Sequence, residues 1–353
     1  DYADRIDEMI AAADLVICRG GAGALTELGV SGTPALIVPL PSAAEDHQAI
    51  NAREIERLGA GLVVYQEAIW KNARIHSHLH GANLARQVIE LCADDQRLGA
   101  MGQAARSIPH PDSLELIIDE LDSLVAGQRP PSLSLEFPQA NRGLPSDPNK
   151  LMRWIQARVA EVGGTAAMEP GELAYLRYQV DRLLVSDAWY EIPLGRRNVG
   201  IKLVGVLQHE HRLHLLLQVL ADRTQSGRLQ RFFGGDYRHG GILRRNAVQY
   251  GIRLLKANDE QTREVLREAL ADDPYFEVRS WAAQVLGEQC GTDDEIERVL
   301  FAALDDDSPE VVVQALSALG KVGRSGDLLE RLRLFYLHPN WQFRHGVILA
   351  FIE

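Results

Sequence analysis

The sequence predicts an α/β unit with a parallel sheet over residues 1–125, followed by an all-α array of repeated helix pairs over residues 151–353. In the first part, short apolar runs alternate with helical segments, an order typical of parallel sheets. In the second part, one apolar helix spacing recurs at intervals of 31 to 33 residues after a first interval of 48. Residues 126–150 contain five prolines and no regular period, so we expect a linker there.

The composition is that of a globular protein. Of the 353 residues, 46% are hydrophobic and 24% are charged, with a formal net charge of -12. This acidic balance argues against nucleic acid as a main partner, although a local basic patch would be compatible with it. Cys18, Cys92 and Cys290 are too scattered for a zinc or disulfide pattern and suit a reducing cytoplasm. No signal peptide or membrane-spanning run is visible, so any membrane contact is expected to be peripheral.

A strand, a glycine turn and a helix follow one another at residues 15–30. Residues 15–18 are apolar, Arg19-Gly20-Gly21-Ala22-Gly23 breaks the run, and residues 24–30 have helical character. At such a turn, unpaired backbone N–H groups and the positive end of the helix dipole can face a phosphate, and glycine lets its oxygens reach the backbone. The pattern therefore predicts a diphosphate site.

Glu27 is expected in the first turn of that helix. From there its carboxylate could accept hydrogen bonds from two ribose hydroxyls, as acidic residues do in other nucleotide folds. Alternatively, Glu27 only complements the helix dipole and the glycines only form a tight turn. The turn alone leaves both interpretations open.

Polar residues also follow the next predicted strand, at residues 35–38. Pro39 and Pro41 end that strand, a loop runs over residues 42–46, and a helix is expected from His47 to about Leu58. The carboxyl end of a strand is where ligands bind in open α/β sheets, and amide and imidazole groups there can bind sugar hydroxyls. The residues so placed are Asp46, His47, Gln48 and Asn51, with Asp46 most simply explained as a helix N-cap.

Three motifs in this region, RGGAGALTE (19–27), GTPALIVPLP (32–41) and EDHQAINA (45–52), resemble in order the donor-binding half of the MurG family. These enzymes transfer N-acetylglucosamine to undecaprenyl-pyrophosphoryl-muramoyl-pentapeptide in peptidoglycan synthesis. The resemblance extends over residues 1–125 and implies a partial Rossmann-like fold, the C-terminal domain of a GT-B glycosyltransferase. We expect no metal and no cofactor.

The resemblance also implies a role for each residue of the donor site. Glu27 would hold the ribose hydroxyls, and a backbone group at Ala3, within Tyr2–Asp4, would border the uracil. The segment matching the family's reader of N-acetylglucosamine contains His47, Gln48 and Asn51. The backbone of Gly21, Ala22, Gly23 and Ala24 would line the diphosphate and the sugar. The helix end from Gly21 to Thr26 would stabilise the departing UDP.

The departures from the family pattern concern the other half of the enzyme. In this family a second Rossmann-like domain carries the acceptor site and the proposed base, and nothing in this sequence matches it. Because the chain starts at Asp1 without a methionine, we expect a fragment of a longer polypeptide. The catalytic residues are therefore unknown, and the fragment alone should be inactive.

The remainder of the first domain carries weaker signals. We expect a strand at residues 61–64, a variable connection at 66–80, a helix at 82–106, and a helix at 112–125 that closes the domain. His76, His78 and His80 alternate in the connection, but no further ligand stands at a usual spacing, so a solvated loop is favoured over a metal site.

The second part reads as an α-solenoid. Two helices are expected at residues 151–162 and 172–184, where Trp154 and Tyr175 should pack rather than bind ligand. DDPYFEVRSWAAQVLGE (272–288) and DDSPEVVVQALSALGKVG (306–323) resemble HEAT repeats, and the array ends in mid-helix, so it is expected to continue. The repeated helix face comprises Val199, Leu203, Val206 and Leu207; Ala247, Gly251, Leu254 and Leu255; Val278, Ala282, Val285 and Leu286; Val311, Ala315, Ala318 and Leu319; and Phe343, Val347, Ala350 and Phe351.

An insert at about residues 224–241 explains the longer first interval. Arginines and aromatic residues gather in and beside it, namely Arg228, Arg231, Arg238, Arg244, Arg245, Phe232, Phe233 and Tyr237. They could dock an acidic partner or a lipid headgroup, but a surface insert packed on the solenoid is favoured. His209, His211 and His214 are expected at the surface rather than at a metal.

Two functional hypotheses follow. The first is the C-terminal part of a MurG-like transferase that moves N-acetylglucosamine from UDP-N-acetylglucosamine to the lipid-linked muramoyl-pentapeptide, peripheral on the inner face of the cell membrane. The solenoid would then bind a protein partner of unknown identity. The second is a HEAT-repeat scaffold with a vestigial nucleotide-binding half, and another UDP-sugar enzyme of the GT-B fold is a further alternative. The intact segments around Glu27 and His47 argue against a vestigial nucleotide-binding half.

Overall fold

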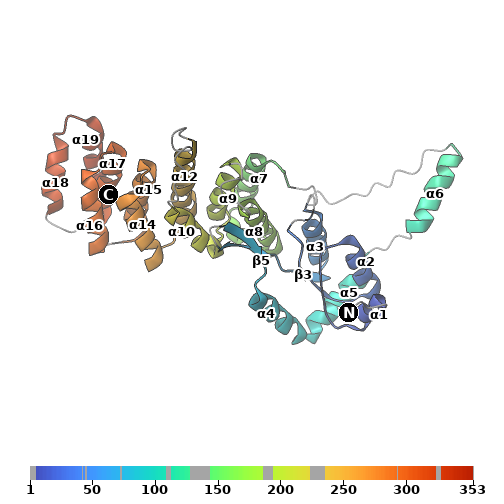
Figure 1. Ribbon diagram of the computed structural model, residues 1–353. Coiled ribbons are helices and arrows are strands. Elements are labelled where there is room, and N and C mark those ends of the chain that lie inside the picture. The colour runs from blue at the N-terminus through green and yellow to red at the C-terminus, as the bar shows by residue number, and fades with distance from the viewer. Residues whose placement is uncertain are drawn as a thin grey trace. The chain divides into compact units, whose positions relative to one another are not determined.

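The computed structural model describes residues 5–41, 43, 46–71, 74–108, 113–127, 144–185, 194–222, 235–291, 293–322 and 327–352. These residues form two compact units, whose elements are labelled in Figure 1. The first unit takes the described residues within Asp1–Ala68, Ser77–Ser146 and Ala167–Arg182. The second takes those within Ile69–His76, Asp147–Ala166 and Leu183–Glu353.

The first unit is built on a parallel sheet, as predicted. Its strands β1 (Val16–Cys18), β2 (Ala35–Ile37) and β3 (Gly61–Val63) lie in the order β1-β2-β3, with Cys18 opposite Ile37 and Ile37 opposite Val63. Helices α2 (Ala22–Ser31) and α3 (His47–Arg57) connect them. Since all three strands run the same way, the turns that lead into α2 and α3 lie at one edge of the sheet.

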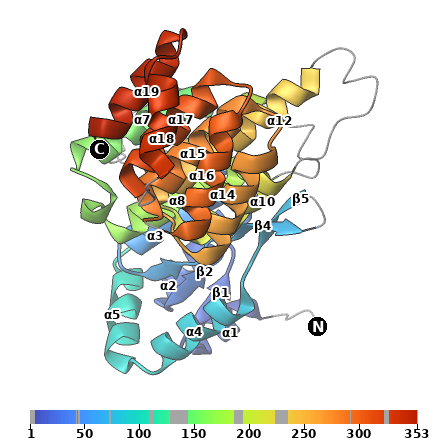
Figure 2. The ribbon, with the colours of Figure 1, turned by 90° about the vertical axis from the view of Figure 1, so that its left-hand side faces the viewer.

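Helices cover both faces of this sheet. Alternate residues of β2 point to opposite faces, as in any strand. Ala35 and Ile37 pack with α2 and α3, whereas Leu36 packs with α4 (Gly81–Cys92) and α5 (Asp95–Arg106). The short helix α1 (Ile6–Ala12) joins the first cluster through Ile10. Figure 2 shows α2, α4 and α5 around β1 and β2. The unit is thus a three-layer α/β/α arrangement.

Two predictions for residues 66–106 were wrong. The helix expected over residues 82–106 is two helices, because Asp94 starts a new one by accepting a hydrogen bond from the Arg97 N–H at 2.9 Å. The connection expected over 66–80 contains a two-stranded sheet of β4 (Glu67–Lys71) and β5 (Arg74–His78).

The helices that follow start within three residues of their predicted positions. In helix α6 (Ser113–Val125), the described apolar residues Ile117, Leu121 and Leu124 are each more than half exposed. These three side chains do not pack on the domain that the helix was expected to close. Helices α7 (Pro148–Glu161) and α8 (Pro170–Leu184) flank a 3-10 turn (Thr165–Ala167), and Trp154 is part-exposed while Tyr175 is buried.

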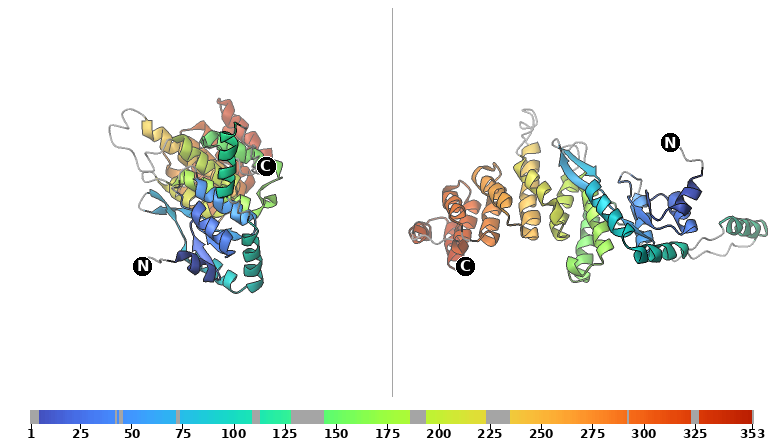
Figure 3. Two further views of the ribbon diagram at one scale, coloured as in Figure 1. Left: turned by 90° about the vertical axis from the view of Figure 1, so that its right-hand side faces the viewer. Right: turned by 90° about the horizontal axis from the view of Figure 1, so that it is seen from below.

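The second unit contains the predicted array of helix pairs. The right-hand view of Figure 3 shows its helices in chain order from green to red. After α7, they are α9 (Leu194–Val206), η4 (Glu210–Arg212), α10 (Leu213–Ala221), α12 (Gly235–Asn246), the π-helical η5 (Ala247–Ile252), α13 (Arg253–Leu255), α14 (Glu260–Asp272), α15 (Phe276–Gln289), α16 (Asp294–Ala302), η6 (Ala303–Asp305), α17 (Pro309–Val322), α18 (Asp327–Tyr336) and α19 (Trp341–Ile352).

The predicted apolar face is the face that packs. All four of its residues in α15 and all four in α17 are buried. Glycine allows these helices to approach closely, because a Cβ on Gly287 of α15 would lie 2.6 Å from the Cβ of Ala318 on α17. In α19 the face is only part-buried, and Phe351 is 66% exposed.

Candidate donor-nucleotide site

The N-terminus of α2 carries the backbone donors that the sequence predicted. Gly21 is the N-cap residue, with φ -74° and ψ 141°, and it has no side chain to cap the helix. The first hydrogen bond within the turn runs from the Leu25 N–H to the Gly21 carbonyl at 3.1 Å. The N–H groups of Ala22, Gly23 and Ala24 therefore have no acceptor within the helix and can bind an anion.

The three glycines of this turn have different environments. A Cβ on Gly21 or Gly23 would meet no atom within 4 Å, so the approach to the helix end is open. A Cβ on Gly20 would instead overlap the Gln48 carbonyl oxygen and lie 2.9 Å from its carbon. Gly20 thus allows the turn to pack against α3, whereas Gly21 and Gly23 leave room for a ligand.

The first turns of α3 hold this edge of the sheet together. The Asn51 Nδ2 donates to the Gly20 carbonyl at 3.2 Å, and the Leu40 N–H donates to Gln48 Oε1 at 3.0 Å. His47, at the first position of α3, is exposed. The structure therefore brings these three residues to the same edge as the glycine turn, and it fixes one end of the Gln48 and Asn51 amides by protein contacts.

Glu27 lies in the second turn of α2, not in the first as predicted, because the helix begins already at Ala22. It is exposed and follows Gly23 by four residues, so the two positions share one face of the helix. The exposed Thr26 donates its hydroxyl back to the Ala22 carbonyl at 2.9 Å, which fixes its side chain on the helix. Ala3 lies outside the described residues.

Asp46 is not the side-chain N-cap that the sequence suggested. It is at the N-cap position in a left-handed conformation, φ 61°, but its carboxylate makes no capping bond. Asp46 is 7% exposed, and its carboxylate binds four side chains of α8 that belong to the same unit. These partners are Tyr175, Tyr178, Gln179 and Arg182.

The buried position of Asp46 affects its ionisation. Burial raises the pKa of its carboxyl, and this effect outweighs the opposing influence of the Arg182 charge and of the hydrogen bonds from Gln179, Tyr175 and Tyr178. Burial likewise raises the pKa of both tyrosines. No local pattern in the sequence could indicate this cluster, because its two halves lie about 130 residues apart.

The histidines of the first unit do not form a metal group. His80 lies 3.3 Å from Glu67, and its ring contacts that of His78 edge to face at 4.8 Å. Within the part of the chain that the structure describes, no three His, Cys, Asp or Glu side chains come together as metal ligands. In the second unit, His209 is buried rather than at the surface as expected.

The arginines beside the predicted insert are engaged within the solenoid. Arg244 is buried and forms a two-pronged ion pair with Asp273 at 2.7 and 3.1 Å, and Arg245 pairs with Glu277. Arg244 is therefore not available to dock a partner. The other arginines and aromatic residues of the insert lie outside the residues whose side chains are described.

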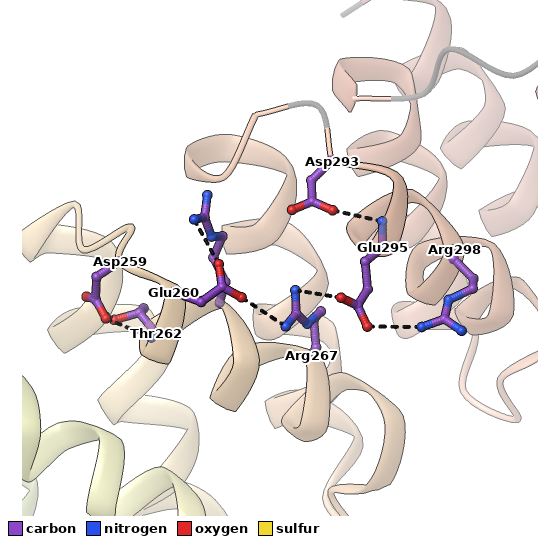
Figure 4. Close-up of polar contacts among 8 residues, drawn as sticks. Asp259, Glu260, Thr262, Arg267, Asp293, Glu295 and Arg298 are labelled. Carbon is purple, nitrogen blue, oxygen red and sulfur yellow. Dashed lines mark hydrogen bonds and ion pairs between the residues drawn. The ribbon is translucent and has the colours of Figure 1, made fainter.

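Charged side chains also link successive outer helices of the array, as Figure 4 shows. Arg267 of α14 pairs with Glu260 at 3.3 Å and with Glu295 of α16 at 3.4 Å, and Glu295 also pairs with Arg298 at 3.0 Å. These contacts join α14 to α16 of the neighbouring repeat. None of the described helices combines the length and apolar character needed to cross a bilayer.

Comparison with known proteins covers both parts of the chain. Residues 1–114 match the family model of the glycosyltransferase family 28 C-terminal domain, and residues 263–351 match that of HEAT repeats. No solved structure matches the chain. The matches confirm both resemblances predicted from the sequence. The family matched by residues 1–114 is a family of glycosyltransferases.

Three relatives carry the same description, "UDP-N-acetylglucosamine--N-acetylmuramyl-(pentapeptide) pyrophosphoryl-undecaprenol N-acetylglucosamine transferase". The protein of Nitratidesulfovibrio vulgaris is 39% identical over 126 residues, 35% of this chain and 32% of the relative. That of Salinibacter ruber is 38% identical over 125 residues, 35% and 30% of the two chains. That of Solidesulfovibrio magneticus is 44% identical over 110 residues, 30% and 27%. The chain thus spans about a third of the length of the curated relatives it matches.

Proposed function

We propose that the first unit is the donor-binding half of a transferase that moves N-acetylglucosamine from UDP-N-acetylglucosamine to the lipid-linked muramoyl-pentapeptide. The observation that carries the proposal is the open N-terminus of α2, where three N–H groups lack an acceptor in the helix and both Gly21 and Gly23 leave space for a ligand. The relatives' description supplies the identity of donor and acceptor.

The chemistry assigned to this site is stabilisation of the departing UDP. As the bond between the sugar and the diphosphate breaks, negative charge grows on the diphosphate oxygens. N–H groups at Ala22, Gly23 and Ala24, already oriented by the helix, stabilise that charge without reorganising. Glu27 lies one helical turn further along the same face, where its carboxylate accepts hydrogen bonds from the ribose hydroxyls.

The sugar is assigned to the neighbouring helix start. His47, Gln48 and Asn51 lie at the edge of the sheet next to the glycine turn and offer imidazole and amide groups. The acceptor site and the base that activates the acceptor hydroxyl belong to the part of the relatives that this chain does not match. We assign the enzyme to the inner face of the cell membrane, as a peripheral protein, and the HEAT repeats to binding a protein partner.

Calorimetric titration with UDP and with UDP-N-acetylglucosamine tests the proposal. Glu27→Ala should weaken both ligands by about 10- to 100-fold, the loss expected for hydrogen bonds to a charged group. Glu120→Ala on α6 is the matched control, because it removes an exposed carboxylate of the same unit far along the chain from the glycine turn. Equal affinities in wild type and Glu27→Ala would contradict the assignment of Glu27. Absence of binding by a longer chain that includes the acceptor half would favour a scaffold.

A further inference from the structure

Helix α8 contacts the start of α3 through a buried polar cluster. Asp46 Oδ1 accepts from Arg182 at 3.0 Å and from the Tyr178 hydroxyl at 3.4 Å, and Oδ2 accepts from the Tyr175 hydroxyl at 3.4 Å and from the Gln179 amide. Both carboxylate oxygens are thus engaged. Asp46, Tyr178 and Gln179 are nearly inaccessible to solvent, so these bonds form in an environment of low polarity.

Aromatic and charged contacts extend this interface along α3. Tyr65, just after β3, stacks on Tyr178 with ring centroids 4.6 Å apart. Arg53 of α3 lies over the Tyr175 ring at 5.6 Å and pairs with Glu169 at 3.3 Å.

The N-terminus of α8 is seated on the same surface. Glu169 caps the helix by accepting the N–H groups of Gly171 and Glu172, both at 2.7 Å. A Cβ on Gly171 would lie 2.6 Å from Glu56 Oε2, so the start of α8 lies against side chains of α3, and Glu56 would have to move to admit a larger residue.

The conformation of Asp46 connects this interface to the donor site. A non-glycine residue in the left-handed region is unfavourable, and Asp46 occupies it directly before His47 and Gln48. The bonds from α8 offset that cost and draw the carboxylate away from the N–H groups of α3. They therefore fix the direction in which α3 leaves the loop.

From these contacts we infer that α8, a helix beyond the residues that match the glycosyltransferase family, holds the start of α3 in position for the sugar of the donor. Asp46, Gln179 and Arg182 are positioning residues, since they act through His47 and Gln48. The identity of the ligand in this inference rests on the proposed function, whereas the role of α8 in holding the start of α3 does not.

The test uses the 353-residue chain with the double substitution Gln179→Leu and Arg182→Met, which keeps side-chain volume and removes two donors to Asp46. The matched control is Arg57→Met, which breaks an exposed ion pair with Glu54 on α3 itself. Hydrogen/deuterium exchange of residues 47–51 should become several-fold faster in the double variant and stay unchanged in the control. Unchanged exchange in the double variant would show that α8 does not hold the start of α3 in position.

The consequence for the ligand is measured by titration. The double variant should lose about tenfold in affinity for UDP-N-acetylglucosamine and less than about twofold for UDP, which lacks the sugar. Asp46→Asn, which tolerates the left-handed conformation and keeps one oxygen, should fall between wild type and the double variant. Equal losses for both ligands would show a general structural role and refute the positioning of the sugar. If neither the wild-type chain nor a longer chain that includes the acceptor half binds either ligand, the proposed function fails, and the exchange measurement still decides whether α8 holds α3.

Discussion

Placing a methyl group on Gly23 separates the folding role of the glycine turn from its role in binding. In the free protein a Cβ at Gly23 meets no atom within 4 Å, and its backbone is helical. Alanine is the better helix former, so Gly23→Ala should leave stability unchanged or raise it by up to about 0.5–1 kcal/mol. In a unit of this size, that corresponds to a rise in Tm of at most about 4 °C.

The same methyl group should obstruct the ligand. A helical Cβ tilts toward the N-terminus of its helix, which here is the direction from which a diphosphate would approach. Displacing one phosphate oxygen from its N–H donor costs about 1.5–3 kcal/mol, so UDP affinity should fall by roughly 10- to 150-fold. Thermal unfolding and calorimetric titration of the same preparation measure both effects.

Gly20→Ala is the contrasting variant, since its Cβ would overlap the Gln48 carbonyl oxygen. Backbone atoms must move to relieve that overlap, and we expect a loss of about 1–3 kcal/mol in stability. A Gly23→Ala protein that is stable and binds UDP like wild type would refute the assignment of the diphosphate to α2. A destabilised Gly23→Ala protein would show that the space beside Gly23 is too small for a methyl group.

Two further predictions concern the solenoid. Arg244→Ala should destabilise the second unit by about 3–5 kcal/mol, because it leaves the fully buried Asp273 carboxylate without its charged partner; urea unfolding measures this, and a loss below about 1 kcal/mol would contradict it. For Asp306, burial raises the pKa, but the bonds from Arg279 and the Ser308 N–H outweigh it and hold the pKa of the folded protein below the usual value of 3.8. The ionised carboxylate therefore stabilises the folded state above pH 3.8, and this contribution is lost as the pH falls through the pKa of the folded protein. Asp306→Asn should thus lower the urea midpoint at pH 7 and approach the wild-type midpoint below about pH 4.

The elements that the sequence predicted correctly are those with a local physical signal. Apolar runs ended by glycine or proline gave β1 and β2, and the spacing of four residues in each repeat identified the buried face of α15 and α17. The pair β4 and β5 was missed because β5 is polar and contains two histidines, and β4 does not alternate strictly between apolar and polar residues. The break before α5 depended on a single capping residue, Asp94.

The candidate site was predictable in part for the same reason. The glycine turn and the segment after β2 are contiguous in sequence, and the parallel sheet brings them to one edge. The role of Asp46 was not predictable, because the side chains that bind it come from α8 and its local position suggested a cap. His209 was likewise misassigned, because a histidine in a polar stretch of sequence gives no local sign that the fold buries it.

The distance in sequence between Asp46 and α8 has a consequence for biogenesis. Tyr175 follows Asp46 by 129 residues and Gln179 by 133. At about 5–20 residues per second, a ribosome adds this stretch in roughly 7–26 s, whereas local helices and loops form in microseconds. The sheet and α3 therefore fold first, with the Asp46 carboxylate still hydrated, and the carboxylate loses that water only when α8 has emerged. Before α8 has been synthesised, the nascent first unit therefore has a complete glycine turn, but the start of α3 is not yet held in its final direction.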